Sequence, residues 1–210
     1  MRVEQGRTVT TNDARKRGLR RDLIEVRNSL PLSDVSAAGS VLSERALQLR
    51  ELAEARTVAA YVSIGREPST RALLERLRAA GVRVLLPVLL PDNDLDWAAY
   101  EGPERLMKAG RGLLEPAGPR LGPEAVTDAG AVFLPGLAVD RRGLRLGRGG
   151  GSYDRVLARL ERAGATPALV VLLYDGEVLE EVPVDPHDRP VQAAVTPSGV
   201  HRFTERPAGA

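Results

Sequence analysis

The pattern of the chain changes after residue 56, and this change most constrains the fold. From Thr57 onward, short apolar runs alternate with amphipathic segments of helical spacing. This alternation is typical of α/β proteins, in which a crossover helix returns the chain to the next parallel strand. We therefore expect a three-layer α/β/α fold, with a largely parallel open sheet, helices on both faces and an N-terminal helical pair.

Two βαβ units account for most of this pattern. We expect strands, in chain order, over residues 57–64, 82–90, 95–100, 131–134, 168–174 and 191–196. Crossover helices are expected between Ser69 or Thr70 and Gly81, and over 152–163. Residues 101–125 are rich in glycine and proline, and we expect them to form a long connection with one helical turn.

The segment before Thr57 is expected to be helical. A helix capped by Asn12 or Asp13 should end before Pro31, and a second helix should run toward Ala53. The expected organisation is a flexible N-terminal tail at 1–12, a single α/β catalytic domain at 13–206 and a flexible C-terminal tail at 207–210.

The composition excludes several kinds of site. Of 210 residues, 43% are hydrophobic and 28% are charged, which suits a globular protein with a sizeable core. The chain has no cysteine, so disulfides, thiolate metal sites and cysteine nucleophiles are excluded. His187 and His201 are the only histidines, so a divalent metal would depend on carboxylates, which favours magnesium or calcium over zinc.

The charge pattern argues against a nucleic-acid or membrane partner. The 30 basic and 28 acidic residues are interspersed, and the seven aromatic residues are not clustered. The N-terminus has no apolar run typical of a signal peptide, and the longest apolar stretch, 84–90, contains Pro87 and is too short to span a bilayer. We therefore expect a cytoplasmic protein.

The most informative stretch runs from Arg145 to Asp154, with the sequence RLGRGGGSYD. Its four glycines allow several backbone N–H groups to approach one ligand, and the following helix start, Arg145 and Arg148 add positive charge. This pattern favours a polyphosphate, although a flexible surface turn has the same composition. Neither standard phosphate loop is present, because the Walker lysine is missing and Ser152 replaces the third glycine of the dinucleotide fingerprint.

At these residues a family resemblance becomes specific. The run from Pro135 to Asp140, then Gly143 and the stretch 145–155, resembles the signature of the 5-formyltetrahydrofolate cyclo-ligases, also called methenyltetrahydrofolate synthetases. Other similar elements follow the family's order: Lys16-Arg17-Gly18-Leu19-Arg20 with Arg27, the segment 61–70, the segment 112–116, Val182-Pro183, His187-Asp188 and Val195-Thr196. The resemblance covers about residues 16–203.

The resemblance implies an ATP- and Mg²⁺-dependent ligase. Its members convert 5-formyltetrahydrofolate to 5,10-methenyltetrahydrofolate and release ADP and phosphate. The formyl oxygen takes the γ-phosphoryl group, and N10 then closes the ring. The partners would be ATP and 5-formyltetrahydrofolate, with or without a polyglutamate tail, and we expect a monomer.

The resemblance also assigns roles to individual residues. The residues assigned to ATP are Lys16, Arg20, Arg145, Gly147, Arg148, Gly149, Gly150, Gly151, Ser152 and Tyr153. Those assigned to folate are Val62, Glu67, Arg148 and Tyr153; to magnesium, Asp154 and Asp188; and to catalysis, Arg145, Arg148 and Tyr153.

Each of these residues also has an ordinary structural explanation. Lys16 and Arg20 share one helix face, which could simply be solvated. Glu67 could be a surface carboxylate, Asp154 a helix-start acid and Asp188 a turn residue.

Three positions depart from the family pattern. Ser152 stands where many members have a tyrosine, Val88 where a basic residue is common, and Glu177 where we expect glutamine. None of these changes removes a proposed phosphate or metal group.

Two other functions fit parts of the pattern. A non-catalytic nucleotide sensor or nucleic-acid binder could use the glycine loop and the basic first helix. A sugar-phosphate isomerase or CoA transferase could share the scaffold, because one fold hosts many chemistries. Lys16 and Arg20 discriminate between these alternatives, because an isomerase would not need them for ATP.

Overall fold

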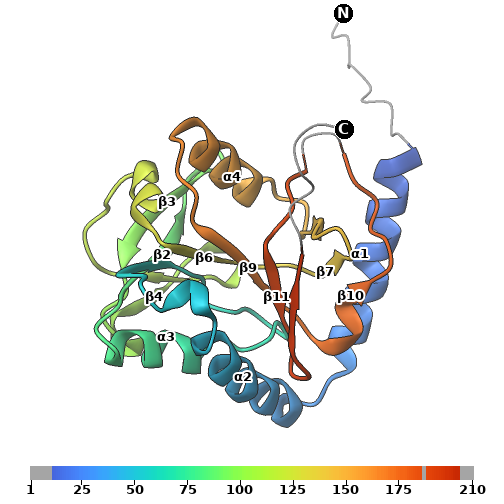
Figure 1. Cartoon of the computed structure of the whole chain (residues 1–210), viewed down its shortest axis with the longest axis horizontal. Coiled ribbons are helices and arrows are strands. Elements are labelled where there is room, and N and C mark those ends of the chain that lie inside the picture. The colour runs from blue at the N-terminus through green and yellow to red at the C-terminus, as the bar shows by residue number, and fades with distance from the viewer. Residues whose placement is uncertain (1–10, 186–187, 204–210) are drawn as a thin grey trace, which may run out of the picture.

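The computed structural model describes residues 11–185 and 188–203, which form a seven-stranded sheet flanked by helices (Figure 1). The strand order is β12-β11-β9-β6-β1-β2-β3. The strands are β1 (Thr57–Ala59), β2 (Arg83–Leu89), β3 (Leu95–Ala99), β6 (Ala131–Leu134), β9 (Ala168–Leu172), β11 (Ala193–Val195) and β12 (Val200–Arg202). The inner pairs are parallel, and only the edge pairs β2/β3 and β11/β12 are antiparallel. This confirms the expected largely parallel sheet.

Helices cover both faces of the sheet, as expected. On one face lie α2 (Leu32–Leu47) and α3 (Arg71–Ala79), and on the other lie α4 (Ser152–Arg162) and the 3₁₀ turn η4 (Pro123–Asp128). The central strand β6 has apolar side chains on both faces of the sheet, so both faces must be covered. Its alternate residues Ala131 and Phe133 belong to the core beneath α2 and α3, whereas Val132 and Leu134 belong to the core beneath α4.

Smaller elements surround this body. They are a sheet of β10 (Val178–Leu179), β7 (Ala138–Asp140) and β8 (Arg145–Leu146), a hairpin of β4 (Leu106–Lys108) and β5 (Leu114–Pro116), and the 3₁₀ turns η1 (Arg50–Leu52), η2 (Pro103–Arg105), η3 (Gly110–Gly112) and η5 (Asp175–Glu177). The hairpin lies in the middle of the connection that the sequence predicts over 101–125. Within 11–185 and 188–203, no helix has the length and apolarity that crossing a bilayer requires.

The first strand is shorter than predicted. It ends at Ala59 instead of residue 64, because local side chains replace the ladder hydrogen bonds beyond it. The Thr70 hydroxyl accepts the Ser63 N–H and donates to the Tyr61 carbonyl, and the Glu67 carboxylate accepts the Ile64 N–H. The segment after β1 therefore becomes a fixed loop.

The first helix, α1 (Thr11–Ser29), differs from the prediction at its start and on its buried face. It already includes Asn12, which the sequence assigned to a flexible tail or a cap, and the Asn12 amide donates to the Val184 carbonyl and the Asp185 carboxylate. Val26 of the expected apolar stripe is 63% exposed, whereas the buried residues are Lys16 and Arg27. Polar side chains therefore attach much of this helix to the rest of the chain.

Arg27 and Glu177 form a buried ion pair that holds the C-terminal half of α1. The Arg27 guanidinium is 2% exposed; its Nε and Nη2 donate to the two Glu177 oxygens at 2.6 and 2.8 Å, and Nη2 also donates to the Gly136 carbonyl at 2.7 Å. The guanidinium carbon of Arg27 lies 5.7 Å from the centroid of the Tyr174 ring. Glutamate at position 177, a departure from the family pattern, thus supplies a full charge opposite Arg27.

We predict that Arg27→Leu lowers the free energy of unfolding by about 3–5 kcal/mol, because Glu177 would be left buried without its partner. Urea denaturation measures this loss. Arg27→Leu combined with Glu177→Leu should lose less, because no charge then remains buried. Arg21→Ala is the matched control on the same helix: its pair with Asp22 is exposed, so the change should cost about 0–1 kcal/mol. Equal effects of Arg27→Leu and Arg21→Ala would contradict the prediction.

Candidate functional site

A cavity of about 890 Å³ lies at the carboxyl ends of the parallel strands β1, β2 and β6. The segments that follow β1 and β6 contribute to its wall, as do α1, the glycine loop and the β4–β5 hairpin. This is the edge at which open α/β sheets bind ligands. Every site residue predicted from the sequence lies on this wall: Lys16, Arg20, Val62, Glu67, Arg145, Gly147, Arg148, Gly149, Gly150, Gly151, Ser152, Tyr153, Asp154 and Asp188. Their individual roles remain predictions.

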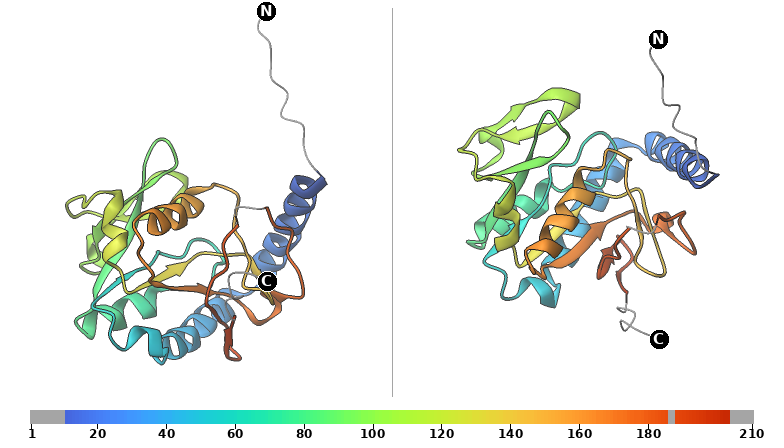
Figure 2. Two further views of the ribbon diagram at one scale, coloured as in Figure 1. Left: turned by 45° about the horizontal axis from the view of Figure 1, so that its top comes forward. Right: turned by 90° about the horizontal axis from the view of Figure 1, so that it is seen from above.

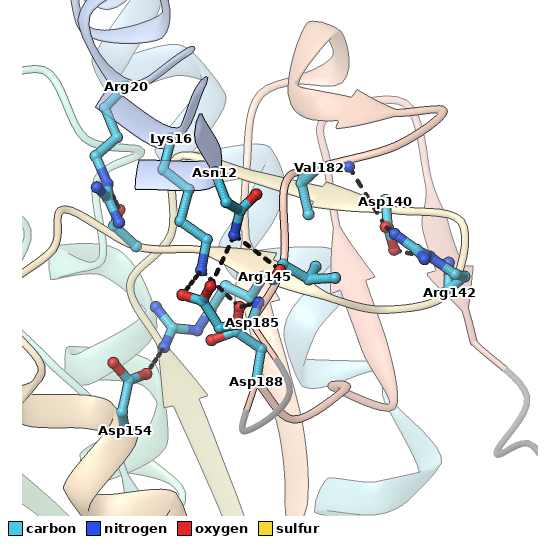
Figure 3. Close-up of polar contacts among 12 residues, drawn as sticks. Asn12, Lys16, Arg20, Asp140, Arg142, Arg145, Asp154, Val182, Asp185 and Asp188 are labelled. Carbon is cyan, nitrogen blue, oxygen red and sulfur yellow. Dashed lines mark hydrogen bonds and ion pairs between the residues drawn. The ribbon is translucent and has the colours of Figure 1, made fainter. Parts of the chain in front are cut away.

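Lys16 and Arg20 reach the cavity from one face of α1. The Lys16 ammonium donates to one oxygen of Asp185 and one oxygen of Asp188, each at 2.7 Å (Figure 3). Burial alone would lower the pKa of Lys16, but the hydrogen bonds and charges of these two acids outweigh it and raise that pKa above its ordinary value. Arg20 donates from Nε to the Gly147 carbonyl at 2.9 Å, which joins the helix to the glycine loop.

The glycine loop depends on conformations that glycine adopts easily. Gly149 has φ +93°, and Gly151, which directly precedes α4, has φ +77°. A Cβ atom on Gly149 would lie 3.3 Å from the Arg20 guanidinium carbon. The loop is therefore packed against α1, in contrast to a free surface turn, and it leads into the N-terminus of α4, where backbone N–H groups suit an anion.

Arg145 is the most buried cation of the loop, with a side chain that is 7% exposed. Its Nη1 donates to the Pro135 carbonyl at 3.0 Å, its Nη2 donates to Asp154 at 3.2 Å, and its Nε is buried without a partner among the described residues. Burial lowers the pKa of Arg145 and is opposed chiefly by Asp154. Figure 3 shows the guanidinium between Asp154 on one side and Asp185 and Asp188 on the other.

Glu67 and Arg148 are in contact on the cavity wall. The Glu67 side chain is 7% exposed; one oxygen accepts the Arg148 Nε at 3.0 Å, and the other accepts the Ile64 N–H at 3.0 Å. The nearby Tyr153 hydroxyl is buried and has no hydrogen-bond partner among the described residues. Burial raises the pKa of Tyr153, and the charge of Glu67 adds to this shift, so the phenol keeps its proton. A ligand could therefore meet a carboxylate acceptor and a phenol donor together.

The predicted metal ligands Asp154 and Asp188 share the cavity but are already paired with cations. Asp154 is 54% exposed beside Arg145, and Asp188 accepts from Lys16 and from the Asp185 N–H. Among the residues described, no three acidic or histidine side chains form a group that could hold a metal ion. The two carboxylates are hard oxygen donors, so a magnesium ion here would need further oxygens from water or phosphate.

Sequence reasoning missed some members of the wall and misjudged others. Asp185 was missed. It lies close to Asp188 in the sequence, and this proximity could have indicated that both carboxylates bind one cation, as they do with Lys16. Arg111 was missed because it precedes the matched segment 112–116. Val88 is buried and is not among the lining residues, so its departure from the family pattern leaves the described wall unchanged. His187 lies outside the described residues.

Comparison with known proteins shows the family of this chain. The model of the 5-formyltetrahydrofolate cyclo-ligase family matches residues 12–197. The 5-formyltetrahydrofolate cyclo-ligase of Mycolicibacterium smegmatis is 44% identical over 68% of this chain and 74% of its own, and that of Escherichia coli is 32% identical over 83% and 96%. The solution structure of Aquifex aeolicus 5,10-methenyltetrahydrofolate synthetase superimposes with a TM-score of 0.76 at 27% identity, over 93% of this chain and 96% of that one. The chain therefore belongs to the 5-formyltetrahydrofolate cyclo-ligase family.

Proposed function

We propose that this cyclo-ligase uses ATP and Mg²⁺ to convert 5-formyltetrahydrofolate to 5,10-methenyltetrahydrofolate, releasing ADP and phosphate. One observation carries the proposal: a single cavity joins a cationic glycine loop to a buried carboxylate. The loop suits a polyphosphate and the carboxylate suits the N–H groups of a pterin. Two substrates with these groups could therefore react where the two regions meet.

The reaction requires the protein to position the two substrates and to supply positive charge. The formyl oxygen attacks the γ-phosphorus, and the bond from phosphorus to the ADP oxygen breaks. N10 then attacks the activated formyl carbon, and the carbon–oxygen bond breaks as phosphate leaves, while N10 loses its proton to solvent. Phosphoryl transfer of this kind depends on aligned groups and on stabilised charge more than on a protein nucleophile.

The cations needed for this step are held in place before any ligand binds. Lys16 is held by Asp185 and Asp188, Arg145 by Asp154, and Arg148 by Glu67. Phosphate oxygens can replace these carboxylates as partners without a large movement of the cations, which is the preorganisation that stabilises developing charge. Arg145 and Arg148 would then act on the transferring group, and Lys16 and Arg20 on the rest of the polyphosphate.

The carboxylates released in this exchange fit the metal. Asp154 and Asp188 would hold Mg²⁺ together with phosphate oxygens. When bound, the ion neutralises phosphate charge.

Glu67 would bind the pterin. Its carboxylate can accept hydrogen bonds from the pterin amino and ring N–H groups, and Val62 lines the same wall. The Tyr153 hydroxyl, which has no hydrogen-bond partner in 11–185 and 188–203, would donate to the substrate. Glu67 also contacts Arg148. The residue proposed to bind the pterin is therefore linked directly to an arginine proposed to bind phosphate.

We also propose that the enzyme acts as a monomer in the cytoplasm, with no nucleic-acid or membrane partner. All the residues assigned to ATP, folate and metal lie on one cavity of one chain, so no second copy is needed to complete it.

We predict that Lys16→Met combined with Arg20→Met lowers ATP-dependent turnover by about 100-fold or more, because two groups facing the phosphates are lost. The assay follows the near-ultraviolet absorbance of the methenyl product, with ATP omitted as the blank. Arg21→Ala is the control, because this exposed neighbour is not on the cavity wall. Arg20→Met alone, which removes no ion pair within the described chain, separates phosphate binding from a folding defect. Full ATP-dependent activity of the double variant would reject this role.

We predict that Glu67→Gln raises the KM for 5-formyltetrahydrofolate by about 10- to 100-fold, because a hydrogen bond to a charged group is lost. The KM for ATP should change less, because Glu67 is linked to the phosphate groups only through Arg148. Steady-state kinetics with each substrate varied in turn measures both constants. Glu124→Gln, an exposed acid away from the cavity, should change neither. A larger change in the KM for ATP than in that for 5-formyltetrahydrofolate would contradict the assignment of Glu67 to the pterin.

A further inference from the structure

The tip of the β4–β5 hairpin contains an arginine in an unfavourable backbone conformation. Arg111 has φ +59° and ψ +23°, in the left-handed region, and it stands between Gly110 and Gly112. Among the described residues, Asn93 is the only other non-glycine residue with positive φ. Glycine would adopt this conformation without strain, so a strained arginine on a cavity wall points to a use for its side chain.

A structural contact could also explain Arg111. Its Nη1 donates to the Asn93 side-chain oxygen at 2.9 Å, which ties the hairpin tip to the turn between β2 and β3. Asn93, however, is not part of the cavity wall, whereas Arg111 is exposed and lines it. The contact with Asn93 occupies one N–H group of a guanidinium that has five. The side chain can therefore hold Asn93 and still present charge to a ligand.

Arg111 belongs to the part of the cavity wall that the hairpin supplies, whereas the cations assigned to phosphate belong to α1 and the glycine loop. Figure 2 shows the yellow-green β4–β5 hairpin on one side of the molecule and the blue helix α1 on the other. Every other cation on the described wall belongs to α1 or to the glycine loop. The wall near the hairpin includes the apolar residues Leu89, Leu95, Leu113 and Leu114. It also includes Glu115, whose carboxylate accepts the Leu89 N–H at 3.0 Å and pairs with Arg120 at 3.8 Å. The hairpin side of the cavity is thus mostly apolar, its one acid is already paired, and Arg111 is its only cation among the described residues.

We propose that Arg111 binds the carboxylates of the folate glutamate tail and makes the hairpin tip a specificity element for tail length. This inference rests on the proposed function. A folate has a pterin at one end, an apolar aryl ring in the middle and anionic glutamate at the other end. With the pterin at Glu67, the leucines suit the aryl ring and Arg111 suits the carboxylates that follow. Each further γ-linked glutamate adds one carboxylate that the positive charge of Arg111 can attract.

The test compares Arg111→Gly with the parent enzyme on three substrates: 5-formyltetrahydropteroate, which has no glutamate, and 5-formyltetrahydrofolate with one and with five glutamates. We expect the KM of the variant to rise about two- to fivefold for the monoglutamate, as for one exposed ion pair, and more for the pentaglutamate. The KM for the pteroate and all kcat values should stay unchanged. The increase should shrink as ionic strength rises.

The substitution to glycine guards against a folding artefact. Glycine adopts left-handed φ freely, so the variant should unfold at the same or a higher urea concentration than the parent. Arg111→Lys keeps the charge and should retain most of the tail preference. Asn93→Gly removes the hydrogen bond from Arg111 to the Asn93 side chain but leaves the charge of Arg111, so it should not change the KM pattern. Arg105→Gln removes an arginine of η2, next to the hairpin but not on the cavity wall, and should not change it either.

Two results would overturn the inference: an Arg111→Gly variant that changes the KM for all three substrates equally or not at all, or an Asn93→Gly variant that reproduces its effect. Calorimetric titration with the same three compounds separates this inference from the proposed function. If the parent makes no ATP-dependent product, the proposed function fails. If it nevertheless binds these folates, and Arg111→Gly weakens only the glutamylated ones, the role of Arg111 stands.

Discussion

The attachment of α1 through charged side chains is the interaction on which the site depends. The buried Arg27–Glu177 pair fixes one half of the helix, and Lys16 with its two aspartates fixes the other. Lys16, Arg20 and Arg27 recur at helical spacing and therefore lie on one face of α1. A single orientation of the helix about its axis lets all three side chains make their contacts. Buried ion pairs add little net stability over apolar packing, but they tolerate few alternative arrangements. The polar face therefore sets which residues of α1 reach the cavity.

Charge balance across the cavity is the second constraint. Lys16, Arg145 and Arg148 would repel one another if they faced an empty site, and each is instead paired with an acid. In the proposed reaction the phosphates would displace these acids, which costs some binding free energy, but the cations would need little reorganisation as charge develops. Glu67 and Arg148 form one of these pairs, so the proposed pterin and phosphate contacts would both act on it.

The sequence predicts the layered body well and its long-range contacts poorly. Strand β6 and helix α4 have nearly the predicted bounds, because apolar periodicity within a few residues defines them. Arg27 and Glu177 are 150 residues apart, and no local pattern pairs them. Strand β1 ends early because the side chains of Glu67 and Thr70 bind the backbone that follows it, which periodicity does not report. The glycine loop was recognisable because its residues are contiguous.

Two parts of the cavity wall are built by elements outside the layered body, α1 on one side and the β4–β5 hairpin on the other. The sheet supplies the fixed middle of the wall through the segments after β1 and β6. A change in the hairpin can therefore alter which substrate is bound without repacking the core, because the tip is exposed and its backbone strain is confined to one turn. Such strain costs about 1–2 kcal/mol. The core supplies the stability that offsets this cost, and the substrate contact proposed for Arg111 would explain why an arginine stands where glycine would be unstrained.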